Sequence, residues 1–220
     1  MNYLFVNFKT YEQATGKTAL RLAKMLEGFE SKKLKIIPVV QAVDLREIIL
    51  KTKLGVFAQH CDPVSYGSNT GHILPEAICD AGAIGTILNH AENKYDDNFI
   101  KKTVERCRSV GLRIMLCAES LERAEKLAVL APDFLAIEPP ELIGGNVSVS
   151  SAKPELISDS VSAIKKISPD TIVITGAGVK TGIDVSKAIE LGTKGVFVAS
   201  GIVCAKDQKK AVADLVSGFS

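Results

Sequence analysis

Short apolar runs rich in β-branched residues alternate along this chain with stretches whose apolar residues recur every three to four positions. The first pattern is typical of buried strands, and the second predicts amphipathic helices. We expect strands at Tyr3–Asn7, Lys35–Val40, Val56–Ala58, Gly85–Leu88, Arg113–Cys117, Phe134–Ile137, Ile172–Thr175 and Gly195–Ala199. Helices are expected at Leu20–Phe29, Leu45–Lys51, Pro75–Ala81, Phe99–Val110, Leu121–Leu130, Leu156–Ile167, Ile183–Leu191 and Lys209–Val216.

Strands that alternate strictly with helices imply a parallel sheet. Eight such units favour closure into a (β/α)8 barrel, with an open doubly wound sheet as the second possibility. The 220 residues, 46% of them apolar, suffice for one sizeable core, and we expect a single domain over residues 1–220. Because such barrels usually have about 250 residues, some helices are expected to be short.

The charge and the cysteines narrow the class of protein. A formal net charge of +2, from 27 basic and 25 acidic residues scattered along the chain, argues against binding to nucleic acid or to a membrane surface. The start, Met1–Lys9, is too soon polar for a signal peptide, and no apolar run approaches the roughly 18 residues of a membrane span. We expect a cytoplasmic protein whose cysteines are reduced packing residues, since they are odd in number and form no C-x-x-C pair: Cys61, Cys79, Cys107, Cys117 and Cys204.

In a barrel of this kind the chemistry lies where strands end and the following loops begin. Polar or glycine-rich segments stand at six of these points: Asn7-Phe8-Lys9, Gln59-His60, Asn89-His90-Ala91-Glu92, Glu138, Gly176-Ala177-Gly178 and Ser200-Gly201.

Glu138 ends a buried-looking strand and enters a loop with two prolines and two glycines, residues 139–145. A general base that is desolvated by a closing lid has this pattern, although a carboxylate that merely starts a turn has it too. Lys9 is either a cation near the barrel mouth or a solvated lysine. His90 is either a catalytic group at a strand end or a structural histidine.

The segment Gly176–Gly182 does not fit the dinucleotide fingerprint, because Thr181 stands where the third glycine is needed. Glycines after the seventh strand, together with Ser200-Gly201 after the eighth, suit a cradle of backbone N–H groups for a phosphate. His60 and Asp62 place two possible metal donors close together, but no further histidine or aspartate at a strand end completes a ligand set. Even with His72 considered, we predict no required metal.

Several longer segments, in order over essentially the whole chain, resemble the triosephosphate isomerase family, and in particular its compact archaeal-type branch. They are Asn7-Phe8-Lys9, Ala58-Gln59-His60, the residues 68–76, Asn89-His90-Ala91-Glu92, the residues 137–145, and Lys187-Ala188-Ile189-Glu190-Leu191-Gly192-Thr193. The resemblance implies a cofactor-free isomerase that interconverts dihydroxyacetone phosphate and glyceraldehyde 3-phosphate through an enediolate, in glycolysis and gluconeogenesis.

By this resemblance, Glu138 is the base and His90, as a neutral imidazole, the electrophile. Lys9 offsets the charge of the phosphate and the enediolate, and Asn7 helps to position the substrate. The lid extends from Pro139 to about Pro154. The residues that hold the substrate's phosphate are Ile143, Gly144, Gly178, Ala199, Ser200 and Gly201.

Four positions depart from the family's usual pattern. Ala91 replaces a serine and Asn93 an arginine, so the usual hydrogen bonding around Glu92 is not carried over. Asn146 replaces a lid glycine and restricts positive φ there, from which slower or different lid closure is expected. Asn69 replaces a histidine in the loop before Thr70.

The family's Thr70 loop reaches into a neighbouring subunit, so a homo-oligomer is expected, either dimer or tetramer. Two other classes of function compete with the isomerase. One is another barrel enzyme acting on phosphosugars; a metal-dependent epimerase would need ligands that this chain lacks, and a Schiff-base aldolase would need a lysine where Glu138 stands. The other is a non-catalytic phosphometabolite-binding protein, which would need only the glycine cradle.

Overall fold

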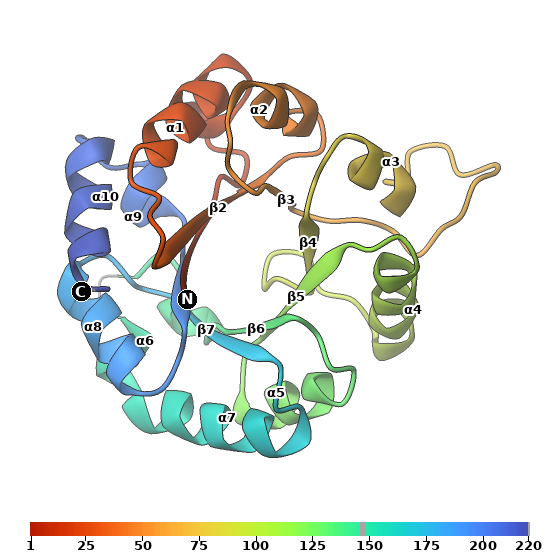
Figure 1. Ribbon diagram of the computed structural model, residues 1–220. Helices are drawn as coiled ribbons and strands as arrows, with labels where there is room; N and C mark the ends of the chain where they lie inside the picture. The colour runs from red at the N-terminus through yellow and green to blue at the C-terminus, as the bar shows by residue number, and fades with distance from the viewer. Residues whose placement is uncertain (146–147, 220) are drawn as a thin grey trace.

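The computed structural model describes residues 1–145 and 148–219, whose strands close into a parallel barrel surrounded by helices (Figure 1). The predicted barrel is confirmed, and the open doubly wound sheet is wrong, because β8 is a hydrogen-bonded neighbour of β1. Every predicted strand is present, with bounds shifted by at most one residue. In the described residues they are β1 Asn2–Asn7, β2 Leu34–Val40, β3 Phe57–Ala58, β4 Gly85–Leu88, β5 Arg113–Ala118, β6 Phe134–Ile137, β7 Ile172–Gly176 and β8 Gly195–Val198.

The predicted helices are all present, with ends that differ from the predictions by up to three residues. They are α1 Lys17–Glu27, α2 Leu45–Lys51, α3 Pro75–Asp80, α4 Asp97–Ser109, α5 Leu121–Ala128, α7 Pro154–Ile167, α8 Gly182–Glu190 and α10 Gln208–Ser217. Four further segments are single turns, too short to show helical periodicity in the sequence: η1 Glu12–Ala14, η2 Pro140–Leu142, α6 Val149–Ala152 and α9 Ser200–Val203. No helix in the described part of the chain is long and apolar enough to cross a membrane.

At the starts of α4, α5, α8 and α10, side chains accept backbone N–H groups that have no partner within the helix. Asp96 accepts the N–H of Phe99 at the start of α4, and α8 begins with a reciprocal capping box between Thr181 and Asp184. These caps fix where the capped helices start, and therefore also the length of the loop between each of them and the preceding strand.

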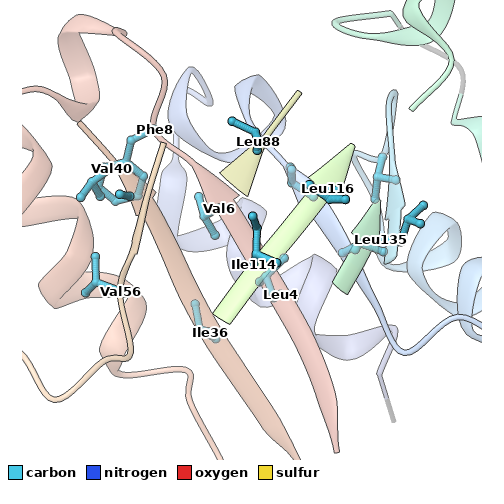
Figure 2. Close-up of a cluster of buried hydrophobic side chains, with 14 of the residues drawn as sticks. Leu4, Val6, Phe8, Ile36, Val40, Val56, Leu88, Ile114, Leu116 and Leu135 are labelled. Carbon is cyan, nitrogen blue, oxygen red and sulfur yellow. The ribbon is translucent and has the colours of Figure 1, made fainter. Parts of the chain in front are cut away.

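Alternate strand residues build two separate cores. One face of each strand packs against the surrounding helices, as Figure 2 shows for Leu4, Val6, Ile36 and their neighbours. The other face fills the barrel interior with aromatic rings in edge-to-face contact: the Phe5 ring centroid lies 5.4 Å from that of Phe57 and 5.0 Å from that of Phe134. The interior is thus a solid support for the residues at the ends of the strands.

The guanidinium of Arg113, at the start of β5, covers the aromatic cluster from the end where the strands begin. Its Cζ lies 5.7 Å from the Phe57 ring centroid and 5.4 Å from the Phe134 ring centroid. A cation over aromatic faces is an attractive arrangement. Together these side chains close the floor of the barrel.

Short helices account for part of the small size of this barrel. The helix α2 has seven residues and α3 six. The segment between β3 and α3, which contains Thr70, projects outward from the ring of helices (Figure 1).

Candidate active site

One pocket at the carboxyl ends of the strands collects every residue for which the sequence predicts a catalytic or substrate-binding role. The space between its lining residues, part of which is open to solvent, is about 470 Å³. The residues so predicted that line it are Asn7, Lys9, His90, Glu138, Ile143, Gly144, Gly178, Ala199, Ser200 and Gly201. Loops from strands far apart in the sequence converge here because the strands are parallel.

Glu138 follows β6 directly, and its backbone N–H donates to the carbonyl of Ala118 at 2.8 Å. The residue is 5% exposed although it lines the pocket. Its Oε2 has no hydrogen-bond partner among the described residues. A buried carboxylate oxygen without a hydrogen-bond partner lowers the stability of the fold. Its presence here therefore indicates a functional role for this oxygen.

Burial raises the pKa of the Glu138 carboxyl above its usual range. The neighbouring imidazole of His90, the thiol of Cys117 and the charge of Lys9 oppose this rise without cancelling it. Cys117 lies beside the carboxylate, and its burial together with the Glu138 charge raises the pKa of its own thiol. A carboxylate with a raised pKa is a stronger base than one in water, which suits proton abstraction.

Gly176, the last residue of β7, leaves the space that the Glu138 side chain occupies. A Cβ at this position would lie 2.4 Å from Glu138 Cγ and 2.7 Å from Oε1, so one of the two must move. We expect Gly176→Ala to lower kcat by about a hundredfold, because a shift of roughly 1 Å in a catalytic group has an effect of that order. Steady-state kinetics would measure it.

Gly28→Ala is the matched control, since a Cβ there would meet only Met25 O, at an ordinary 3.5 Å, and the backbone has helical φ. This control should keep full turnover. If Gly176→Ala keeps kcat within twofold of the unmutated value, the contact does not set the position of the carboxylate.

His90 faces Glu138 across the pocket, with Nε2 3.8 Å from Glu138 Oε2. Its other ring nitrogen, Nδ1, accepts the backbone N–H of Glu92 at 3.2 Å. A ring nitrogen that accepts a hydrogen bond carries no proton, so the ring is neutral with its proton on Nε2. The rings of His90 and Phe197 are in edge-to-face contact, with centroids 6.1 Å apart, and this contact limits the orientation of the imidazole. His90 can therefore donate a hydrogen bond into the pocket.

Lys9 follows β1 in a left-handed backbone conformation, with φ of +45°. Its N–H donates to Asn7 Oδ1 at 3.0 Å, and its carbonyl accepts from Gln59 Nε2 at 2.9 Å. Its Nζ lies 2.6 Å from Glu92 Oε1. Strained conformations of this kind persist where the surroundings enforce them, as Asn7 and Gln59 do here.

The two residues beside Glu92 that differ from the family's usual pattern, Ala91 and Asn93, change the hydrogen bonds around it. Glu92 bonds to Lys9 Nζ, while its Oε2 lies 3.6 Å from His90 Nδ1. Asn93 turns to the hydroxyl of Tyr95 at 2.6 Å. Ala91 has no side-chain hydroxyl, so it adds no hydrogen bond to those around Glu92.

Part of the pocket lining is built mainly of backbone. Gly144 and Gly178 both have φ of +71°, which glycine adopts without strain. The first residues of the short helix α9, Ser200 and Gly201, follow Ala199. The first N–H groups of a helix have no partner within it, so they are available to an anion.

The predicted lid, from Pro139 to about Pro154, is not one irregular loop. It contains η2 and α6, and its expected last residue, Pro154, already begins α7 because proline is favoured in the first helical turn. An ion pair between Glu141 and Lys153 joins the two ends of the segment, and the N–H of Val149 donates to Ala177 O at 3.2 Å. Asn146 lies outside the described residues, so its predicted effect on closure stays a prediction.

Sequence reasoning missed other residues of the site. Gly176 was predicted only as part of a glycine segment after the seventh strand and Cys117 only as a packing residue; both contact Glu138, because β5, β6 and β7 lie side by side. Lys180 follows a glycine loop that was recognised, so its position could have signalled it. The remaining lining residues that were not predicted are Tyr11, Gly145, Ala177, Val179, Lys180, Phe197 and Val198.

The two histidines that were considered as metal ligands, His60 and His72, do not lie together in one site. His60 Nε2 lies 3.1 Å from Asp62 Oδ1, so these two groups bond to each other, and His72 is exposed. Within residues 1–145 and 148–219 there is no group of three or more His, Cys, Asp or Glu placed to hold a metal ion.

Comparison with known proteins gives one consistent result. The family model described as triosephosphate isomerase matches residues 2–217. The triosephosphate isomerase of Methanothermus fervidus is 44% identical over 215 residues, which cover 97% of both chains. That of Methanocaldococcus jannaschii is 40% identical over 97% of this chain and 98% of its own, and that of Archaeoglobus fulgidus 41% identical over 98% and 97%.

Proposed function

This chain belongs to the triosephosphate isomerase family, and from that premise we propose how its own residues interconvert dihydroxyacetone phosphate and glyceraldehyde 3-phosphate. The chain is an enzyme, an aldose-ketose isomerase of glycolysis and gluconeogenesis. The observation that supports the assignment of roles best is the buried, unpaired Oε2 of Glu138, 3.8 Å from His90 Nε2 in a pocket that glycine backbone also lines.

We propose that Glu138 removes a proton from the carbon beside the substrate carbonyl and delivers it to the neighbouring carbon. His90 donates from Nε2 to the carbonyl oxygen and so stabilises the enediolate that forms between the two steps. Lys9 places a cation near the developing negative charge, and Asn7 holds Lys9 in position through its backbone N–H. No cofactor takes part in these steps.

We further propose that the amides of Gly144, Gly178, Ser200 and Gly201 bind the phosphate, with Ile143 and Ala199 beside them. The lid then covers the pocket and excludes water, so that the enediolate does not lose its phosphate. Lid closure of this sort is well known in this family. The Glu141–Lys153 pair and the Val149–Ala177 hydrogen bond support the view that the lid has defined contacts at both of its ends.

A coupled assay for the conversion of glyceraldehyde 3-phosphate into dihydroxyacetone phosphate tests the proposed function. The protein is purified and treated with a chelator beforehand, so that an epimerase or aldolase that needs a metal gives no signal. We expect rapid turnover that does not change when divalent metal is added back. Absence of turnover in the intact, folded protein would contradict the proposal and favour a phosphometabolite-binding protein.

We propose that the chain forms a homo-oligomer, a dimer or tetramer, through the Thr70 loop. The loop is fixed at its base, where Asp62 bonds to Ile73 through backbone and carboxylate, and its projecting tip is exposed. Tyr66 in this tip is 78% exposed, and large exposed aromatic side chains are typical of interfaces. The work of such an enzyme in glycolysis further suggests the cytoplasm as its location.

Thr70→Arg should shift the protein toward monomers, because the arginine side chain would have to be buried in the interface without an oppositely charged partner. Light scattering on a sizing column would measure the mass. Ser162→Arg on the exposed face of α7 is the control and should leave the mass unchanged. An unmutated protein that is monomeric at micromolar concentration would contradict the proposed oligomer.

A further inference from the structure

The groups assigned to the reaction give the pocket an unfavourable charge for its substrate. Lys9 supplies one positive charge, but Glu92 lies 2.6 Å from its Nζ, and Glu138 adds a second negative charge in its reactive form. With His90 neutral, these groups sum to one negative charge. A phosphate monoester carries about 1.5 to 2 negative charges near neutral pH. Backbone amides alone would have to overcome the repulsion.

Lys180 is the other cationic residue that lines this pocket in the described part of the chain. Its backbone is held in place, because its N–H donates to Asp184 Oδ2 at 3.1 Å within the capped start of α8. Its side-chain stem runs beside the start of α9. A Cβ built on Gly201 would lie 3.5 Å from Lys180 Cγ and 3.1 Å from the carbonyl oxygen of Val179.

The absence of a side chain at Gly201 therefore lets the Lys180 stem and the Val179 carbonyl lie close against the first turn of α9. The same turn supplies the amides of Ser200 and Gly201 to the proposed phosphate site. Residues of β7's loop and of α9 thus meet at one end of the pocket, and Lys180 is the charged one among them.

We propose that Lys180 is a phosphate-binding residue that makes this pocket select dianionic over uncharged substrates. It places a positively charged side chain in the pocket beside the amides at the start of α9. This inference rests on the proposed function and adds to it a side-chain cation beside the amides proposed to bind the phosphate. The amides give the geometry of phosphate binding, and Lys180 supplies the charge.

The assignment predicts a particular kinetic signature. The phosphate keeps its charge while the enediolate forms, so a cation that touches only the phosphate stabilises substrate and transition state alike. Its loss raises KM more than it lowers kcat. It also weakens competitive inhibition by inorganic phosphate by the same factor as it raises KM.

The test is Lys180→Met, which keeps the length of the stem and removes the charge, with Lys180→Arg as the conservative variant. We expect KM for glyceraldehyde 3-phosphate and Ki for inorganic phosphate to rise together about tenfold in Lys180→Met, and to return most of the way in Lys180→Arg. The difference between the two enzymes should shrink at high salt. Lys166→Met on the exposed face of α7 is the matched control.

Values of KM and Ki within twofold of the unmutated enzyme in Lys180→Met would overturn the inference, as would a fall in kcat alone. Neither result would affect the proposed function, because the unmutated enzyme would still turn over in the same assay. If Lys180→Met loses activity through misfolding, its melting temperature shows it, and the Ki of the folded Lys180→Arg variant with its salt dependence then decides the question.

Discussion

Replacing Glu138 with glutamine is expected to lower kcat by about a thousandfold or more, while the protein stays folded. The amide has nearly the same shape as the carboxyl group but cannot take up a proton from carbon, and a positioned general base contributes about 10²- to 10⁴-fold to rate. Glu138→Asp keeps the base and withdraws it by one methylene, so its loss should be smaller, about a hundredfold. Steady-state kinetics in the coupled assay would measure both variants.

Stability gives this prediction an independent control. Burial raises the pKa of the Glu138 carboxyl in the folded protein above its value in the unfolded chain. The contribution of this carboxyl to the unfolding free energy is therefore most favourable at a pH below the pKa of the unfolded state. It is lost as the pH rises through the pKa of the folded state. At neutral pH the ionised side chain therefore destabilises the fold. Glu138→Gln should have an unfolding free energy at least as high as the unmutated protein near pH 7, with the advantage shrinking toward about pH 4.

Denaturant titrations at the two pH values would measure this difference, and Glu125→Gln on the exposed face of α5 is the control for both readouts. A Glu138→Gln variant that retains a tenth or more of the unmutated kcat would rule out Glu138 as the base. A variant that is inactive because it is unfolded would show as a loss of unfolding free energy.

His90→Gln is expected to lower kcat by roughly a hundredfold to a thousandfold, with a smaller change in KM. The imidazole donates from Nε2 because Nδ1 accepts the Glu92 N–H, and removing one such donor from a developing oxyanion costs about that much in rate. Glutamine can place an amide near the same point, but it lacks the fixed orientation that Phe197 and Glu92 give the ring.

His60→Gln is the matched substitution outside this pocket, since His60 bonds to Asp62 and stacks on Tyr95. It should keep most of the turnover. Equal losses in the two variants would mean that His90 acts through the fold and not through the reaction.

The sequence carried most of the information needed for the barrel and for the site. Alternating strand and helix patterns recur eight times, and one carboxylate, one histidine and one lysine stand at strand ends, where a barrel brings them together. Glu138, His90 and Lys9 were found in this way because strand ends can be recognised from apolar runs alone. Their roles rest on the family resemblance and stay proposals.

Other features could not be read from local patterns. The contact between Gly176 and Glu138 depends on β6 and β7 lying side by side, and the Cys117 thiol reaches the same carboxylate from β5. The single turns η2, α6 and α9 are too short for helical periodicity, and tertiary contacts hold them. Lys180 follows a glycine segment that the sequence marks, but nothing in the local pattern places its side chain beside α9.

The floor formed by Arg113 over Phe57 and Phe134 has a consequence for how molecules enter and leave. Since the barrel is filled below the pocket, substrate and product must enter and leave through the same opening, which the proposed lid covers. Each turnover then needs at least one opening for loading and one for release, in strict succession. Any change that slows the opening of the lid therefore slows the entry and release of ligands equally in the forward and reverse directions of the reaction.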